Sequence, residues 1–232
     1  MRTKRIGSHN EPEVYQFLSG YKIGRWLPQY MGVVNIEGSM FMMMEDINSG
    51  YESPCLIDIK LGTRHHDFTL SDHRKKKLIE RARGTTVESL GLLVMDMKIR
   101  SEGKIKWVMT RHDGLNLFRY QFMVVLMEFL PREKRREALD AVFRFEEDYL
   151  DFKRRFPDSR MFSSSIIMCY DGDHTDAPMR VRLIDMVHFH KDIKEIGEDP
   201  TNRDTNDGVE FGLKNLCSIL RRITEPSCCS VS

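Results

Sequence analysis

The chain has 232 residues, of which 41% are hydrophobic and 31% are charged. This balance is too apolar for a disordered chain and too polar for a bundle of membrane helices, and no stretch reaches the roughly 18 apolar residues that a membrane span requires. Thirty-six Lys and Arg residues against 35 Asp and Glu residues give a net charge of +1. We therefore expect no general affinity for nucleic acid, and any basic site has to be local.

The five cysteines predict a reducing environment. Their number is odd, no two have Cys-x-x-Cys spacing, and the neighbours Cys228 and Cys229 lie in a Ser-rich segment. This pattern argues against a disulfide scaffold and against a zinc site. Because the first 13 residues lack the apolar core of a signal peptide, we expect a protein of the cytoplasm, the nucleus or both.

The first part of the chain predicts a short helix, a strand pair and a linker. Residues 13–18 have a helical pattern, and the chain is then interrupted by Leu27-Pro28. Apolar residues over 31–36 and 39–44 predict two buried strands joined by a Glu-Gly turn. The polar, Gly-ended segment 45–50 is typical of a linker between layers.

The next part predicts a strand, a helix and a hairpin. Residues 54–62 alternate in polarity and predict an extended strand, whereas 71–83 predict a helix with a polar N-cap at its start. The stretches 91–99 and 104–110 flank a Glu-Gly turn and predict a hairpin.

The remaining elements place the chain in the α+β class. Residues 117–130 and 132–155 predict two helices separated by a proline. Residues 161–170 and 180–187 predict apolar strands, and a final helix is expected over 208–223. Early strands, central helices, and a closing hairpin and helix are typical of an α+β fold.

Two charged residues interrupt the strand at 54–62. Asp58 and Lys60 alternate with apolar residues, so in an extended chain their side chains point to the same face. A carboxylate and an ammonium group side by side can bind a hydroxyl and a phosphate together. The spacing alone favours the alternative, an exposed salt bridge on a strand.

A basic stretch follows over residues 60–83. On the predicted helix Lys76 and Arg83 project to one side, whereas Leu78, Ile79 and Ala82 gather on another and are expected to anchor the helix. The short cationic face suits a small polyanion, and its few aromatic residues weaken a single-stranded nucleic-acid interpretation. A solvated charge run or a nuclear import signal remains an alternative.

A lone carboxylate, Asp185, ends an apolar strand. Carboxylates in such positions hold Mg²⁺ against nucleotide phosphates in many phosphotransferases. The serines Ser163, Ser164 and Ser165 precede the paired strand and are hydrogen-bond donors. A strand-end aspartate that caps the following turn is the alternative.

Four segments together resemble motifs of the inositol polyphosphate kinase family, in the family's order. The sequence Pro-Cys-Leu-Ile-Asp-Ile-Lys-Leu-Gly at 54–62 matches its P-x-x-x-D-x-K-x-G signature. Ser163–Ser165 resembles its serine motif, and Ile-Asp-Met-Val-His at 184–188 resembles its metal-binding I-D-F-A-H segment. Residues 207–220 resemble its terminal helix. The resemblance covers about residues 11 to 223.

The resemblance implies a two-lobed fold similar to that of a protein kinase. The N-lobe and hinge strand are expected over residues 1–47 and the C-lobe over 48–232, with an inositol-phosphate-binding helix over 67–86. We also expect a truncated N-lobe that lacks the family's first strand hairpin, because so little sequence precedes Glu11.

The resemblance also implies a role for each matching residue. It assigns catalysis to Lys60 and Asp185; ATP binding to Lys4, to the backbone of Glu45 and Ile47, and to Asp58; substrate binding to Lys60, Arg64, Lys76, Arg83 and His188; Mg²⁺ binding to Asp185; and supporting roles to Ser163, Ser164 and Ser165.

The activity implied is ATP- and Mg²⁺-dependent phosphorylation of an inositol phosphate. The segments 62–66 and 85–91 most resemble the inositol hexakisphosphate kinases, which implies conversion of inositol hexakisphosphate to a diphosphoinositol product. Two alternatives are a multikinase acting on inositol tris- and tetrakisphosphates and a non-catalytic inositol phosphate binder. We expect a monomer with no nucleic-acid partner.

Overall fold

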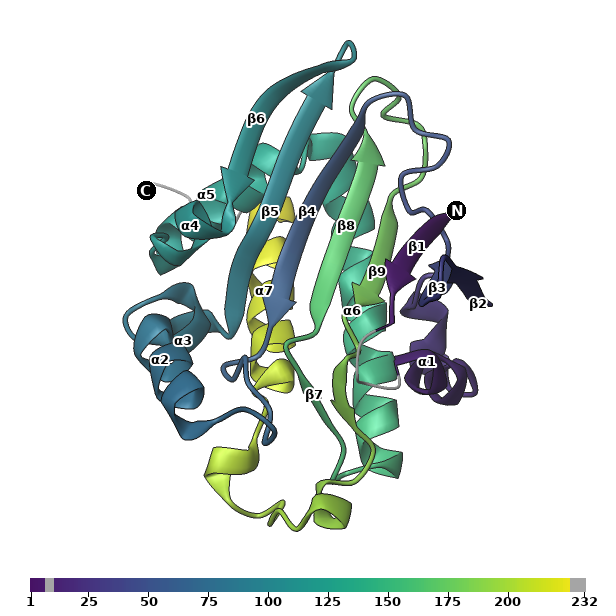
Figure 1. Cartoon of the computed structure of the whole chain (residues 1–232). Helices are drawn as coiled ribbons and strands as arrows, with labels where there is room; N and C mark the ends of the chain where they lie inside the picture. Colours follow the sequence, from purple (N-terminus) through teal and green to yellow (C-terminus); the bar gives the residue numbers. More distant parts are fainter. Residues whose placement is uncertain (7–10, 226–232) are drawn as a thin grey trace, which may run out of the picture.

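The computed structural model describes residues 1–6 and 11–225, which leaves the predicted features at Cys228 and Cys229 outside the described residues. Two antiparallel sheets of three and five strands dominate the fold (Figure 1). Helices lie behind the larger sheet, and the smaller sheet lies beside its β9 edge. Among the described residues, no helix is both long enough and apolar enough to cross a bilayer.

The smaller sheet has the strand order β1 (Arg2–Arg5), β3 (Ser39–Met44), β2 (Tyr30–Ile36). Between β1 and β2 the chain forms α1 (Glu11–Ser19) and the short helix η1 (Lys22–Trp26). The predicted helix and strand pair are confirmed. The prediction that both strands are buried is wrong: Met42 is buried, but four apolar residues of these strands, Met31, Val33, Ile36 and Met40, are 38–46% exposed. One face of this small sheet is open, and β2 is an edge strand.

The larger sheet has the order β6 (Lys104–Thr110), β5 (Leu92–Ser101), β4 (Pro54–Leu61), β8 (Ser165–Asp171), β9 (Arg180–Ile184). The predicted hairpin is β5–β6. In β4 every second side chain, from Cys55 to Leu61, is fully buried, while Asp58 and Lys60 lie on the opposite face. The alternation seen in the sequence is therefore the alternation between the two faces of the central strand.

Helices α5 (Arg119–Phe129), α6 (Arg132–Arg155) and α7 (Val209–Thr224) lie behind the larger sheet (Figure 1). Each buries an apolar stripe, as the helical periodicity predicts. Helix α6 begins directly after Pro131, which is favourable because proline is tolerated at a helix start.

The predicted strand over 161–170 is two strands instead of one. β7 (Arg160–Phe162) pairs with β10 (His188–His190), and β8 pairs with β4 and β9. Ser163 has a φ of 60°, in the left-handed region, and this residue separates the two pairings. The predicted strand over 180–187 likewise ends at Ile184, because Asp185 has a φ of 62°.

The predicted basic helix is α2 (Asp72–Ala82), followed by α3 (Thr86–Leu90). Arg83 lies beyond its end with an extended ψ of 134°, so the helical face drawn from Lys76 to Arg83 stops short of Arg83. No residue of α2 is buried: of the three apolar residues expected to anchor the helix, Leu78 and Ala82 are half-buried and Ile79 is 46% exposed. The short helices α4 (Arg111–Leu115), η2 (Ile193–Ile196) and η3 (Arg203–Thr205) complete the described elements.

The boundary at residue 47 between two lobes stays a prediction. The chain passes from β3 to β4 through residues 45–53, where the two sheets separate. A single apolar cluster nevertheless includes Tyr15, Leu18 and Met42 of the N-terminal part together with the helices behind the larger sheet.

Candidate functional site

The exposed face of β4 carries the centre of the site. Asp58 and Lys60 both lie in the electrostatic field of Asp185, which comes directly after β9. Burial lowers the pKa of the Lys60 ammonium, and the nearby Arg111 lowers it further, whereas Asp185 and Asp58 raise it. The predicted pair on β4 and the predicted strand-end carboxylate are therefore neighbours in space.

Lys4 connects this centre to the N-terminal sheet. Its Nζ lies 2.9 Å from Asp185 Oδ1 and 2.9 Å from Oε1 of the buried Glu11 at the start of α1. Burial alone would lower the pKa of Lys4, but the two carboxylates outweigh it and the pKa is raised. A strand lysine held by a helix glutamate is also the arrangement that positions phosphates in protein kinases.

A cavity of about 130 Å³ lies between the two sheets at this point. Its apolar walls include Met44, Ile47, Ile167 and Ile184, and its charged end holds Lys4 and Asp185. An apolar slot that ends in a cation and a carboxylate suits a flat heterocycle whose attached phosphates point to the charged end.

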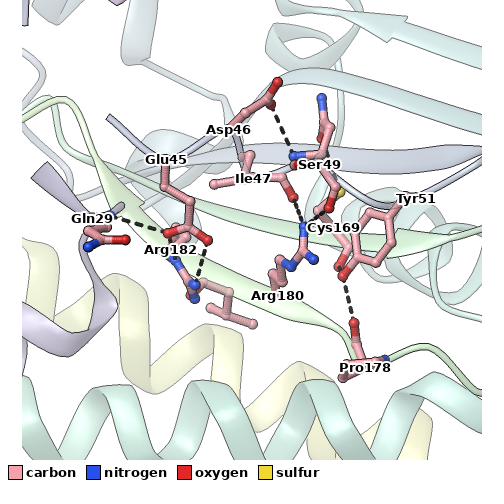
Figure 2. A network of polar contacts seen from close by, with 12 residues as sticks. Gln29, Glu45, Asp46, Ile47, Ser49, Tyr51, Cys169, Pro178, Arg180 and Arg182 are labelled. Carbon is pink, nitrogen blue, oxygen red and sulfur yellow. Dashed lines mark hydrogen bonds and ion pairs between the residues drawn. The ribbon is translucent and has the colours of Figure 1, made fainter. Parts of the chain in front are cut away.

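Residues 45–49, which follow β3 and include the predicted hinge contacts, are held by two arginines of β9 (Figure 2). Arg182 binds the Glu45 carboxylate through Nε and Nη2, at 3.0 and 2.9 Å. Burial raises the pKa of Glu45, but the bonds from Arg182 outweigh it and the pKa is lowered. Arg180 donates to the carbonyl oxygens of Ile47 (2.8 Å) and Ser49 (2.6 Å). The backbone of this segment is therefore already fixed before a ligand binds to it.

The three serines predicted to support the site, Ser163, Ser164 and Ser165, make different contacts. Ser163 donates to the carbonyl oxygen of His65 at 2.9 Å, and Ser164 donates to that of Met161 at 3.2 Å. Ser165 pairs in register with Lys60 and is buried beside Asp58, whose pKa it lowers in part. The serines thus fix the turn between β7 and β8 below the charged centre.

A second, larger cavity of about 500 Å³ lies between α2, α4 and the segment that follows β4. The described residues that line it include no carboxylate, but they include four arginines and two histidines: Arg64, Arg81, Arg111, Arg203, His65 and His66. The three apolar residues of α2 that we expected to anchor the helix, Leu78, Ile79 and Ala82, line this cavity. Such a lining suits a polyanion.

Of the predicted substrate-binding residues, Arg64 lines this cavity, and its guanidinium lies 4.7 Å from the ring centre of Phe68 and 5.0 Å from that of Phe162. Lys76 and Arg83 are exposed and lie outside the residues that line it. Their assignment stays a prediction.

His188 lies on β10, where its Nδ1 is 2.7 Å from Oδ2 of the buried Asp67. Burial raises the pKa of Asp67, but hydrogen bonds from Thr69 and His188 outweigh it, so the pKa is lowered. Asp67 therefore holds the His188 ring, and the substrate contact predicted for His188 remains untested.

Sequence reasoning missed Glu11, Arg180, Arg182 and Arg111. A signal existed for the β9 arginines, because Arg180, Arg182 and Ile184 alternate with two buried residues and so share a face. No pattern distinguished Arg111, which is the first residue of the five-residue helix α4, directly after β6.

The donors present fit a divalent cation held mainly by phosphate. Among the described residues, no three His, Cys, Asp or Glu side chains gather to form a closed metal site. Mg²⁺ in phosphotransferases is usually held by one or two carboxylates together with substrate phosphates and water. Asp185, whose carboxylate is 45% exposed beside the cavity, supplies such a carboxylate.

Asp58 gives a testable pH dependence. Burial raises the pKa of its carboxyl from 3.8 to about 6, and its Oδ1 is buried without a hydrogen-bond partner within the described chain. Between these two pH values the folded state holds a proton that the unfolded state releases, so stability falls as the pH rises through this window.

We therefore expect Asp58→Asn to increase the free energy of unfolding at pH 8 by about 2–3 kcal/mol and to have little effect at pH 4. Urea denaturation of both proteins at the two pH values measures this. A variant that is less stable than the parent at pH 8 would contradict the assignment of Asp58 as an unpaired buried acid.

Comparison with protein families matches residues 41–221 to the family described as inositol polyphosphate kinase. This is well over half of the chain and includes Asp58, Lys60 and Asp185. The chain belongs to the inositol polyphosphate kinase family. The family suggested by the four sequence motifs is thereby confirmed.

Among curated relatives, mouse inositol hexakisphosphate kinase 3 is 28% identical over 209 residues, which cover 80% of this chain and 51% of that protein. Human inositol hexakisphosphate kinase 2 is 27% identical over 224 residues, covering 81% of this chain and 52% of that protein. The chain therefore spans about half the length of the curated relatives it matches.

The fold of this family member is also found in solved structures. The Saccharomyces cerevisiae inositol phosphate multikinase Ipk2, in complex with ADP and Mn²⁺, matches with a TM-score of 0.77 and 20% identity over 97% of this chain and 99% of that one. A second inositol phosphate multikinase structure gives a TM-score of 0.68 at 20% identity over 92% of this chain. These likenesses confirm the predicted two-lobed, kinase-like fold class.

Proposed function

We propose that this chain transfers the γ-phosphoryl group of ATP to an inositol phosphate. One observation carries the proposal: Lys60 of β4 interacts electrostatically both with Asp185, which lines the smaller cavity, and with Arg111, which lines the arginine-rich larger cavity. A cation close to both a nucleotide slot and a polyanion site would lie where a phosphoryl group passes.

The roles follow from the physics of phosphoryl transfer. The transition state is loose and its charge is spread over the phosphoryl oxygens, so catalysis depends on positioning and on charge neutralisation. Lys4 and Lys60 supply two positive charges, and both interact with Asp185. Asp58 and the hinge at 45–47 would hold the nucleoside.

Asp185 would hold Mg²⁺ at the phosphate end of the slot, where Lys4 would be a second positive charge facing the phosphates. Mg²⁺ held there would neutralise negative charge on the nucleotide phosphates. The solved multikinase structure with ADP and Mn²⁺ shares this fold and supports this choice of cofactors.

For the acceptor, we propose inositol hexakisphosphate, since the two curated relatives described above are inositol hexakisphosphate kinases. This acceptor has no free hydroxyl, so an attacking phosphate oxygen would form a phosphoanhydride bond as ADP leaves. A multikinase would instead attack through a ring hydroxyl, release its proton and form a phosphate monoester. The chemical class of the product therefore separates the two activities.

The test is ATP consumption with inositol hexakisphosphate or an inositol trisphosphate as acceptor, with ³¹P NMR of the products. A phosphoanhydride signal that appears only with the hexakisphosphate supports the proposal. New monoester signals with the trisphosphate would assign the multikinase activity instead. Binding of either acceptor without ATP consumption would make the chain a non-catalytic inositol phosphate binder.

Lys76 and Arg83 are expected to attract inositol hexakisphosphate electrostatically without contacting it. Because both are exposed and outside the cavity lining, we expect Lys76→Glu with Arg83→Glu to weaken inositol hexakisphosphate binding about tenfold at low salt, with the effect nearly lost at about 0.5 M salt. Calorimetric titration at the two salt concentrations measures this. The same double reversal at Arg144 and Arg155 on α6 is the control. A loss that persists in high salt would mean direct contact with the substrate.

A further inference from the structure

Arg111 lines the larger cavity, and no contact within the described residues accounts for its guanidinium Nε. It lies at the junction of β6 and α4 and lines the 500 Å³ cavity. Its Nε is buried and has no hydrogen-bond partner within the described residues. Buried polar groups are almost always paired, and an unpaired donor on a charged group is especially unfavourable. A cavity-lining arginine whose Nε has no partner in the described chain is therefore a candidate for binding an anionic ligand in that cavity.

The backbone that carries Arg111 is rigid. Thr110 donates to Asp113 Oδ2 through both N and Oγ1 at 2.8 Å, which caps the short helix α4. Gly114 packs so closely on β5 that a Cβ atom there would collide with the carbonyl oxygen of Val94. The position of Arg111 is therefore set by the sheet, so little ordering is needed when a ligand arrives.

The neighbours of Arg111 are basic. Its charge lowers the pKa of Lys60 and of His65, although burial is the larger cause for both. The pKa of His65 falls to about 3, so this ring is neutral, and its Nε2 is also buried without a partner in the described chain. Arg111 and His65 thus both line the cavity, each has a buried nitrogen atom without a partner in the described chain, and both interact electrostatically with Lys60.

We infer that Arg111 binds a phosphate group of the inositol phosphate in this cavity. The inference rests on the function proposed above and adds a specific substrate contact to it. A guanidinium presents a planar set of donors that matches two oxygens of one phosphate. Arg64 differs, because its Nε donates to the His66 carbonyl oxygen at 3.1 Å and its guanidinium stacks on two phenylalanines.

The test is calorimetric titration with inositol hexakisphosphate, together with thermal unfolding without ligand. Arg111→Met should raise the Kd about 10- to 100-fold, the range expected for loss of a charge-assisted contact. Arg111→Lys should recover part of this loss, because it restores the charge without the planar donors. Arg119→Met is the matched control: it removes the same charge from an exposed residue on α5, outside this cavity, and should leave the Kd unchanged.

Thermal unfolding separates binding from a structural role. Because Arg111 leaves a buried donor unpaired, Arg111→Met should keep or raise the Tm of the unliganded protein. A structural arginine would instead lower the Tm when it is replaced. Unchanged Kd values in both Arg111 variants, or a lowered Tm that accounts for the weaker binding, would overturn the inference.

Activity measurements make the two proposals separable. If the parent protein consumes ATP with inositol hexakisphosphate and Arg111→Met has the same KM for it, the inference about Arg111 fails and the proposed function stands. If the parent protein binds the hexakisphosphate through Arg111 but consumes no ATP, the proposed function fails and the Arg111 site stands. If the parent protein binds no hexakisphosphate, the Arg111 inference fails as well.

Discussion

Asp185→Asn is expected to lower kcat by roughly 10³-fold while the protein stays folded. The amide keeps the size of the side chain but removes the negative charge that would hold Mg²⁺ at the phosphate end of the smaller cavity. Lys4 loses one of its two carboxylate partners and keeps Glu11, 2.9 Å from its Nζ.

The backbone at Asp185 makes asparagine the right replacement. Its φ of 62° lies in the left-handed region, which asparagine tolerates about as well as aspartate. Asp185→Ala should lose the same activity but also about 1 kcal/mol of stability, since alanine is less favourable in that conformation. Steady-state kinetics and thermal unfolding of the two variants measure this, with Asp176→Asn on an exposed loop as the control. A kcat near that of the parent protein in Asp185→Asn would refute the metal assignment.

The residues of β4 show what the sequence was able to predict. Strict alternation over 54–61 predicts both the strand and the shared face of Asp58 and Lys60, because the period of a strand is local. The proximity of Asp185 to this pair came only with the family motifs, since it depends on β8 lying between β4 and β9.

The end of α2 shows where local reasoning stopped. Periodicity extends the helix to Arg83, but the helix ends at Ala82. Arg83 is extended, and Gly84 after it has a φ of 71°, in the left-handed region. The arginines that line the cavity include Arg111, which lies 51 positions after Lys60 and is brought to the cavity through the pairing of β4, β5 and β6. Such a placement depends on tertiary pairing, which has no signature near Arg111 itself.

The second large effect is expected at Lys60. Lys60→Met should lower kcat by roughly 10²–10³-fold and change the KM for ATP by less than about fivefold, because its charge matters most as the phosphoryl group moves between the cavities. The methionine retains most of the aliphatic length that packs on the β4 face. Since burial lowers the pKa of Lys60, removal of this ammonium should not destabilise the fold.

Two further variants test whether the position of the charge matters at Lys60. Lys60→Arg keeps the charge but replaces a compact ammonium by a planar guanidinium, so we expect little recovery of kcat at this half-buried position. Lys98→Met is the control on the adjacent strand β5, where Lys98 pairs with Asp96 at 2.7 Å. Full recovery in Lys60→Arg would mean that only net charge is required. A pure rise in the KM for ATP in Lys60→Met would instead mean that Lys60 binds the nucleotide. The moving phosphoryl group would then be neutralised by another cation, Lys4 of the smaller cavity or Arg111 of the larger one.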